Sequence, residues 1–156
     1  MTPLSVLARP AMMRMGVCSE ELCFGHAALS TFFGLGNGLP MQRGGTIHQS
    51  AIARLQRRAN AGGWVHLFAE GRVWQEVGPL KWGLAKLIAN CSTPPVIVPF
   101  FHMGMEHVMP QDFENQLKGI VPAFGFDITA AVGDPVDVTD LITAYHEAAK
   151  TRASLR

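Results

Sequence analysis

The chain has 156 residues, which is enough for one domain with its own hydrophobic core. Its composition is poor in charge, with 48% hydrophobic and 16% charged residues, whereas an average domain has roughly 25% charged residues. The formal net charge of +1 gives no long-range field for nucleic acid, and no apolar run approaches the roughly 18–20 residues that a membrane-spanning helix needs.

The chain carries three cysteines, Cys18, Cys23 and Cys91, and no Cys-x-x-Cys pair. An odd, scattered set favours reduced or core thiols over a disulfide framework or a zinc site, so no metal is expected. Residues 1–18 are expected to form an irregular or partly helical lead-in, because prolines interrupt them. The arginines in this stretch precede no continuous apolar core, so no cleavable secretory signal is predicted.

The first predicted helix begins at Ser19, which is a good N-cap residue, and the acidic pair Glu20-Glu21 suits the positive end of the helix dipole. Glycines at positions 34, 36 and 38 end this helix. Its apolar face is formed by Leu22, Leu29 and Phe33. His26 within it is interpreted as a surface or core histidine, and a polar group facing a groove is the alternative.

A short strand over residues 39–41 is expected to deliver Arg43 onto the turn Gly44-Gly45. A guanidinium binds phosphate with a planar fork, and glycines allow backbone N–H groups to approach an anion closely. An ordinary loop arginine is the alternative. Residues 47–59 then predict an amphipathic helix whose arginines form a solvated face or meet anionic lipid.

The stretch 62–72 predicts a short buried strand that ends at a chemically distinctive pair. Two glycines precede the mostly apolar residues 64–68, and Glu70-Gly71 follow them. A carboxylate and a glycine directly after a buried strand indicate a site at the end of that strand, where a ligand or another backbone approaches closely. A surface turn with a solvated glutamate is the alternative.

The second half continues to alternate between helix and strand. Residues 80–91 predict an amphipathic helix, 96–101 a strand buried on both faces, 126–132 a further strand, and 141–149 the start of a final helix. This alternation predicts an α/β domain with a mixed, mainly parallel sheet flanked by helices.

Several blocks, in this order and at these gaps, resemble the tafazzin family of the glycerolipid acyltransferase superfamily over roughly residues 14–135. The blocks are residues 29–33, Pro40 with Arg43-Gly44, residues 63–68 with Glu70-Gly71, Lys81-Trp82-Gly83 with Leu87-Ile88, residues 95–99, and His102-x-Gly104-Met105. The resemblance implies a glycerolipid acyltransferase-like fold, with residues 1–156 forming a single, partial acyltransferase domain.

The resemblance also implies an enzyme that transfers acyl chains between phospholipids and lysophospholipids and remodels cardiolipin without a cofactor. It implies a peripheral or monotopic protein of the inner or outer mitochondrial membrane, facing the intermembrane space. The apolar residues from Phe100 to Met109 are predicted to lie in the membrane interface. Oligomeric state remains open.

In this superfamily an Arg-Gly block helps to hold the lipid phosphate, and its counterpart here is Arg43-Gly44. A Phe-Pro-Glu-Gly block shapes the same site. Its counterpart is Phe68-Ala69-Glu70-Gly71, with alanine where the family has proline. The resemblance therefore assigns substrate binding to Arg43, Gly44, Glu70 and Gly71.

The family's catalytic pair is His-x-x-x-x-Asp, upstream of all these blocks, in which the histidine acts as general base and the aspartate orients it. No histidine precedes Ser19, so the chain is expected to be an N-terminally incomplete form or a short form without the base. His107 and Asp112 have the spacing but lie after the other blocks, with a proline between them, and are not expected to be catalytic. His66, within the apolar strand, is expected to be a packed histidine.

Two further classes of function remain open from the residues. One is a non-catalytic phospholipid-binding or interaction module with the same fold. The other is a generic nucleotide-binding α/β domain, which ranks last because neither common glycine-rich phosphate loop is present.

Overall fold

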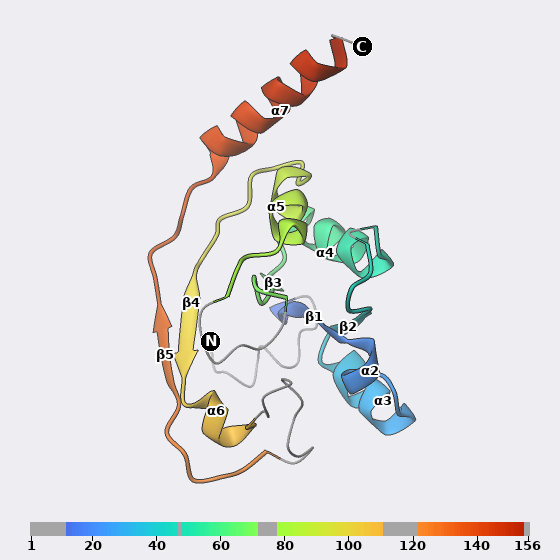
Figure 1. The fold of residues 1–156 in the computed structure, drawn as a ribbon, viewed down its shortest axis with the longest axis vertical. Helices are drawn as coiled ribbons and strands as arrows, with labels where there is room; N and C mark the ends of the chain where they lie inside the picture. Colours follow the sequence, from blue (N-terminus) through green and yellow to red (C-terminus); the bar gives the residue numbers. More distant parts are fainter. Residues whose placement is uncertain (1–11, 47, 72–77, 111–121, 155–156) are drawn as a thin grey trace.

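The structure is a computed structural model that describes residues 12–46, 48–71, 78–110 and 122–154. It has a three-stranded sheet in the order β2-β1-β3 and a separate two-stranded ribbon of β4 and β5 (Figure 1). In the sheet, β1 (Met15–Ser19) lies parallel to both β2 (Gly38–Met41) and β3 (Val65–His66). The expected α/β fold with a mainly parallel sheet flanked by helices is thereby confirmed.

The core lies where α4 (Ser50–Asn60) packs across all three strands and against α5 (Trp82–Ala89). Its central buried side chains are Leu39, Ala51, Leu55 and Leu87, with partly buried apolar residues from β1, α4, β3 and the segment just after β3 around them. Ala51 and Leu55 are four residues apart on α4, so they share the face that meets the sheet. The predicted amphipathic helix is therefore present, and its stripe forms the centre of the core.

The predicted helix from Ser19 is broken into α2 (Glu20–Cys23) and α3 (Ala27–Leu35). Ser19 makes no side-chain capping bond, whereas His26 caps α3, because its Nδ1 accepts a hydrogen bond from the Ala28 N–H at 3.3 Å. Gly25, a poor helix former, lies at the break. His26 is thus an exposed helix cap that also lines the groove described below, in agreement with both alternatives, and its capping role was not predicted.

Two expectations for the beginning of the chain are wrong. Residues 15–18 belong to strand β1 rather than to an irregular lead-in, because their backbone pairs with β2 and β3. Cys18 and Cys23 form a disulfide, since one strand end and one helical turn bring their Cα atoms to 6.0 Å, within the range for such a bond. Cys91 is the free, buried thiol that the sequence predicted for it.

The expectation of a strand buried on both faces at 96–101 is also wrong. Strand β4 (Phe100–Met103) pairs antiparallel with β5 (Thr129–Val132), and the single bridge between Ile97 and Val136 extends the pairing. Side chains such as Phe101 and Val132 are more than half exposed. The apolar run correctly indicated a strand, but its burial depends on neighbours that the run does not specify.

Two helices complete the chain. The short α6 (Met105–Val108) follows β4, and α7 (Thr139–Ser154) extends away from the sheet at the C-terminal side of the molecule (Figure 1). The buried Ile142 and a hydrogen bond of 2.8 Å from His146 Nε2 to the Ala89 carbonyl hold α7 against the region of α5.

Candidate functional site

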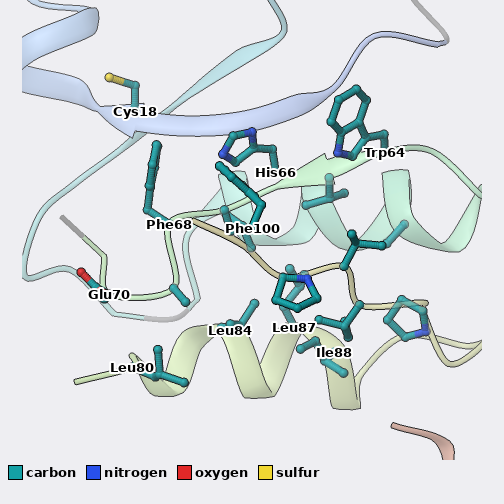
Figure 2. Close-up of a pocket in the computed structure, with 18 of the residues that line it drawn as sticks. Cys18, Trp64, His66, Phe68, Glu70, Leu80, Leu84, Leu87, Ile88 and Phe100 are labelled. Carbon is teal, nitrogen blue, oxygen red and sulfur yellow. The ribbon is translucent and has the colours of Figure 1, made fainter. Parts of the chain in front are cut away.

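A large, mostly apolar groove of about 2080 Å³ runs between the end of β3, helix α5 and strand β4. Figure 2 shows Leu84, Leu87 and Ile88 of α5 on one side and His66, Phe68 and Phe100 on the other. Trp64 lies toward one end of the view, and Glu70 and Leu80 lie toward the other. A groove with this lining suits acyl chains better than a small polar metabolite.

Three charged residues of the groove follow the carboxyl ends of the three parallel strands. Glu21 follows β1, Arg43 follows β2 and Glu70 follows β3, and all three line the groove. Because the three strands are parallel, the segments after their carboxyl ends meet at one edge of the sheet, the usual position of ligand sites in α/β folds. The groove therefore carries a cation and two carboxylates at its sheet edge.

Arg43 lies on the turn directly after β2, and its side chain is exposed. Gly44 follows it with φ +70°, a left-handed conformation that glycine adopts without strain. A hydrogen bond of 3.3 Å from the Gly45 N–H to the Gln42 carbonyl closes this turn. Gly44 therefore shapes the turn that presents Arg43.

Glu70 is half-buried in an equally tight turn after β3. The Gly71 N–H donates to the Phe68 carbonyl at 2.9 Å, and Gly71 has φ +73°. Ala69 is the first central residue of this turn, the position at which proline is favoured in common β-turns. The turn is thus formed with alanine in place of the family's proline, and Glu70 faces the groove. The structure brings Arg43 and Glu70 to one groove, and their role in substrate binding stays a prediction.

His66 lies inside the groove in a cluster of four rings from β3, β4 and the residues after β3. Its ring centroid is 4.9 Å from that of Phe100 and 5.2 Å from that of Phe68, and His102 lies 6.2 Å from both phenylalanine rings. Burial, together with the positive charge of Arg14 and the proximity of His102, lowers the pKa of His66 from its ordinary value. Its Nε2 is buried and has no hydrogen-bond partner among the residues that the structure describes. The packed histidine expected from the sequence is what the structure contains.

Phe100 and His102 are groove residues that sequence reasoning did not assign to a site. The signal that could have found them is their spacing, because residues two apart in a strand point to the same face of the sheet. His107 stacks on Phe126 at 5.6 Å and lies 3.7 Å from Glu106, on the exposed side of α6, whereas Asp112 lies outside the described residues. Among the described histidines, none is hydrogen-bonded to an aspartate.

The described residues contain neither a metal-ligand cluster nor a membrane-spanning helix. No group of three or more histidine, cysteine or acidic side chains in the described ranges is arranged to hold a metal ion. Within those same ranges, no helix has both the length and the apolar character required to cross a bilayer.

The fold and the groove define a domain suited to long apolar ligands with a charged group. Residues 4–103 match the acyltransferase family, and the chain belongs to that family. The match covers the sheet, α4, α5 and β4, which include most of the groove.

Within this family the chain is similar to the tafazzins, as its blocks predicted. It is 32% identical over 142 residues to tafazzin of Drosophila melanogaster, covering 90% of this chain and 36% of that protein. It is 32% identical over 149 residues to taffazin of Dictyostelium discoideum, covering 92% of this chain and 50% of that protein. It is also 34% identical over 131 residues to N-acylphosphatidylethanolamine synthase of Arabidopsis thaliana, covering 82% of this chain and 46% of that protein. The chain thus spans half the length or less of these relatives.

Proposed function

We propose that this domain binds a phospholipid or lysophospholipid for tafazzin-like acyl transfer in cardiolipin remodelling. The acyl chain lies along the groove between α5 and β4, and the phosphate lies at Arg43. The observation that carries the proposal is that Arg43 and Glu70, from separate segments of the chain, border the same large apolar groove.

The charge arrangement supports this orientation of the lipid. A guanidinium donates paired hydrogen bonds to phosphate oxygens, so Arg43 is suited to the headgroup. Apart from His102, the lining side chains of α5 and β4 are apolar, and burying one such side chain against an acyl chain contributes roughly 1.5–3 kcal/mol. Glu70 lies at the same sheet edge as Arg43, and its carboxylate attracts amine or hydroxyl groups, so it is suited to the hydroxyl or amine part of a headgroup whose phosphate lies at Arg43.

The reaction proposed for the whole enzyme needs no cofactor. A hydroxyl of the lysophospholipid attacks the ester carbonyl of the donor phospholipid, the donor ester bond breaks, and the proton of the attacking hydroxyl ends on the released donor hydroxyl. A general base positioned at the attacking hydroxyl supplies about 10²–10⁴-fold in such a step. We assign the binding half of this chemistry to Arg43 and Glu70.

The acceptor could also be an amine, since a relative at 34% identity carries the name N-acylphosphatidylethanolamine synthase. Supplying the whole enzyme with phosphatidylcholine labelled in its acyl chain as donor, and with either lysophosphatidylglycerol or phosphatidylethanolamine as acceptor, separates the two, because each product then has a different headgroup from the donor. We expect an O-acyl product. Exclusive formation of the N-acyl product would contradict the proposed reaction, and lipid binding without turnover would fit a non-catalytic lipid-binding module.

The β4–β5 ribbon gives the proposed attachment to the mitochondrial membrane a physical basis. Phe101 and Met103 of β4 are more than half exposed, in agreement with peripheral contact through apolar side chains. We expect the protein to pellet with membranes and to be released by detergent. Release by high salt alone would show that charge rather than apolar insertion holds it.

The binding proposal is tested by comparing Arg43→Ala with Arg57→Ala. Both arginines are exposed, but Arg57 lies on α4 and does not line the groove. We expect Arg43→Ala to weaken binding to anionic lysophospholipid vesicles about tenfold or more, and Arg57→Ala to have little effect. Equal losses would mean that the arginines act only as surface charge, and the phosphate site would be wrong.

A further inference from the structure

The side chain of Gln49 is held by three hydrogen bonds to the turn that carries Arg43. Its Oε1 accepts from the Gln42 N–H at 2.8 Å, and its Nε2 donates to the carbonyls of Gln42 and Thr46, each at 3.1 Å. These backbone groups lie on both sides of Arg43 and Gly44. Gln49 therefore ties together the two ends of the turn.

This use of the side chain differs from that expected at its position. Gln49 is the N-cap residue of α4, where a polar side chain commonly accepts hydrogen bonds from the first helical N–H groups. Here it makes no such capping bond, and only its backbone carbonyl bonds into the helix, accepting from the N–H groups of Ile52 and Ala53. The side chain is committed to the arginine turn.

Gly45 makes this close packing possible. A Cβ at position 45 would collide with Nε2 of Gln49 and would lie 3.2 Å from the Gln42 carbonyl oxygen. The turn thus combines a left-handed Gly44 with a second glycine against which the amide of Gln49 packs.

The position of Arg43 depends on this turn. Within the described parts of the chain, its guanidinium forms no ion pair and no side-chain hydrogen bond, so no partner group orients it. The backbone of the turn sets where and in which direction the side chain of Arg43 leaves the chain, and Gln49 supplies the side-chain bonds that hold that backbone against the start of α4.

We propose that Gln49 is a positioning residue for phosphate recognition, acting by holding the Arg43 turn in the conformation that aims the guanidinium at the lipid phosphate. The inference rests on the proposed function of Arg43. An amide is required because it offers one acceptor and two donors on a single side chain. A glutamate would keep the acceptor but would place a carboxylate against the carbonyls of Gln42 and Thr46.

The test compares Gln49→Glu with Gln56→Ala, a control on the same helix whose side chain bonds to the Asn90 carbonyl, away from the arginine turn. The probe is binding to micelles of a maltoside detergent, which has no phosphate, that contain either lysophosphatidylglycerol or monoacylglycerol, which lacks phosphate. We expect Gln49→Glu to reduce the preference for the phosphate-bearing lipid about tenfold and Gln56→Ala to leave it unchanged. A purely structural role would weaken binding to both lipids alike.

A double variant separates positioning from an independent contact. If Gln49 acts through Arg43, Gln49→Glu combined with Arg43→Ala should have the same preference as Arg43→Ala alone. The inference would be overturned if the double variant lost the sum of the two single losses in lipid preference. It would also be overturned if Arg43→Ala lost the preference while Gln49→Glu kept it. No effect of Arg43→Ala would instead refute the proposed function itself.

Gly45→Ala keeps the proposal falsifiable if Gln49→Glu does not fold. The added methyl displaces the flexible end of Gln49 without introducing charge. We expect it to reduce the same lipid preference, while the urea midpoint shows that the domain remains folded. A folded Gly45→Ala variant with full preference would contradict the positioning role.

Discussion

Replacing Leu55 with alanine should remove the best-buried side chain of the core. Leu55 is 0% exposed and packs among Leu39, Ala51 and Leu87, which come from β2, α4 and α5. Leucine-to-alanine changes in such positions cost about 2–5 kcal/mol, and the cost grows with the cavity left behind. Partly buried neighbours such as Met15 can shift into the space, since methionine adapts to irregular gaps. We therefore expect Leu55→Ala to lower the free energy of unfolding by about 3 kcal/mol.

The assay is urea unfolding followed by circular dichroism. With a urea dependence of roughly 1–3 kcal/mol per molar, a loss of about 3 kcal/mol lowers the midpoint by about 1–3 M. Leu35→Ala is the matched control, because Leu35 lies on α3 and is 77% exposed, so its loss should stay within about 0.5 kcal/mol. Equal midpoint shifts for the two variants would refute the assignment of the core.

Two other predictions concern a turn and a histidine. Gly104 has φ +91°, and a Cβ there would collide with the Asp127 carbonyl. Gly104→Ala should therefore lower the free energy of unfolding by at least about 1–2 kcal/mol in the same urea assay. An unchanged urea midpoint would contradict this packing. The pKa of His66 is lowered in the folded state by burial, Arg14 and His102, so the unfolded chain binds a proton more readily. The free energy of unfolding should therefore fall as pH drops through the ordinary histidine pKa of about 6.5, and should level off below the folded pKa. His66→Phe should remove this part of the pH dependence, and an identical dependence in the variant would show that His66 is not its source.

The sequence allowed the prediction of those features that depend on residue type at a strand end. The sequence correctly predicts turns after strands at Arg43, which precedes two glycines, and at Glu70, which precedes one. The signal is reliable because few residues other than glycine suit such turns. Their meeting at one groove follows from the parallel direction of β2 and β3. These are local signals whose consequences are fixed by sheet topology.

Features that depend on how the elements are arranged, or on which way a side chain points, could not be predicted in the same way. Cys18 and Cys23 pair because β1 ends where α2 begins, and no strand had been expected there. The apolar residues around Phe100 predicted a strand but could not show that its partner is the antiparallel β5. The role of Gln49 depends on side-chain direction, which spacing alone does not give.

The most direct test of the account locates the bound lipid. A lysophospholipid with a photoreactive diazirine near the end of its acyl chain is crosslinked to the protein, and the labelled peptides are identified by mass spectrometry. The account predicts labels on the groove residues of α5 and β4, such as Leu84, Ile88 and Phe100, and weaker labelling in Arg43→Ala. Labels concentrated on α7, or labelling that Arg43→Ala leaves unchanged, would contradict the proposal that this groove holds the acyl chain with its phosphate at Arg43.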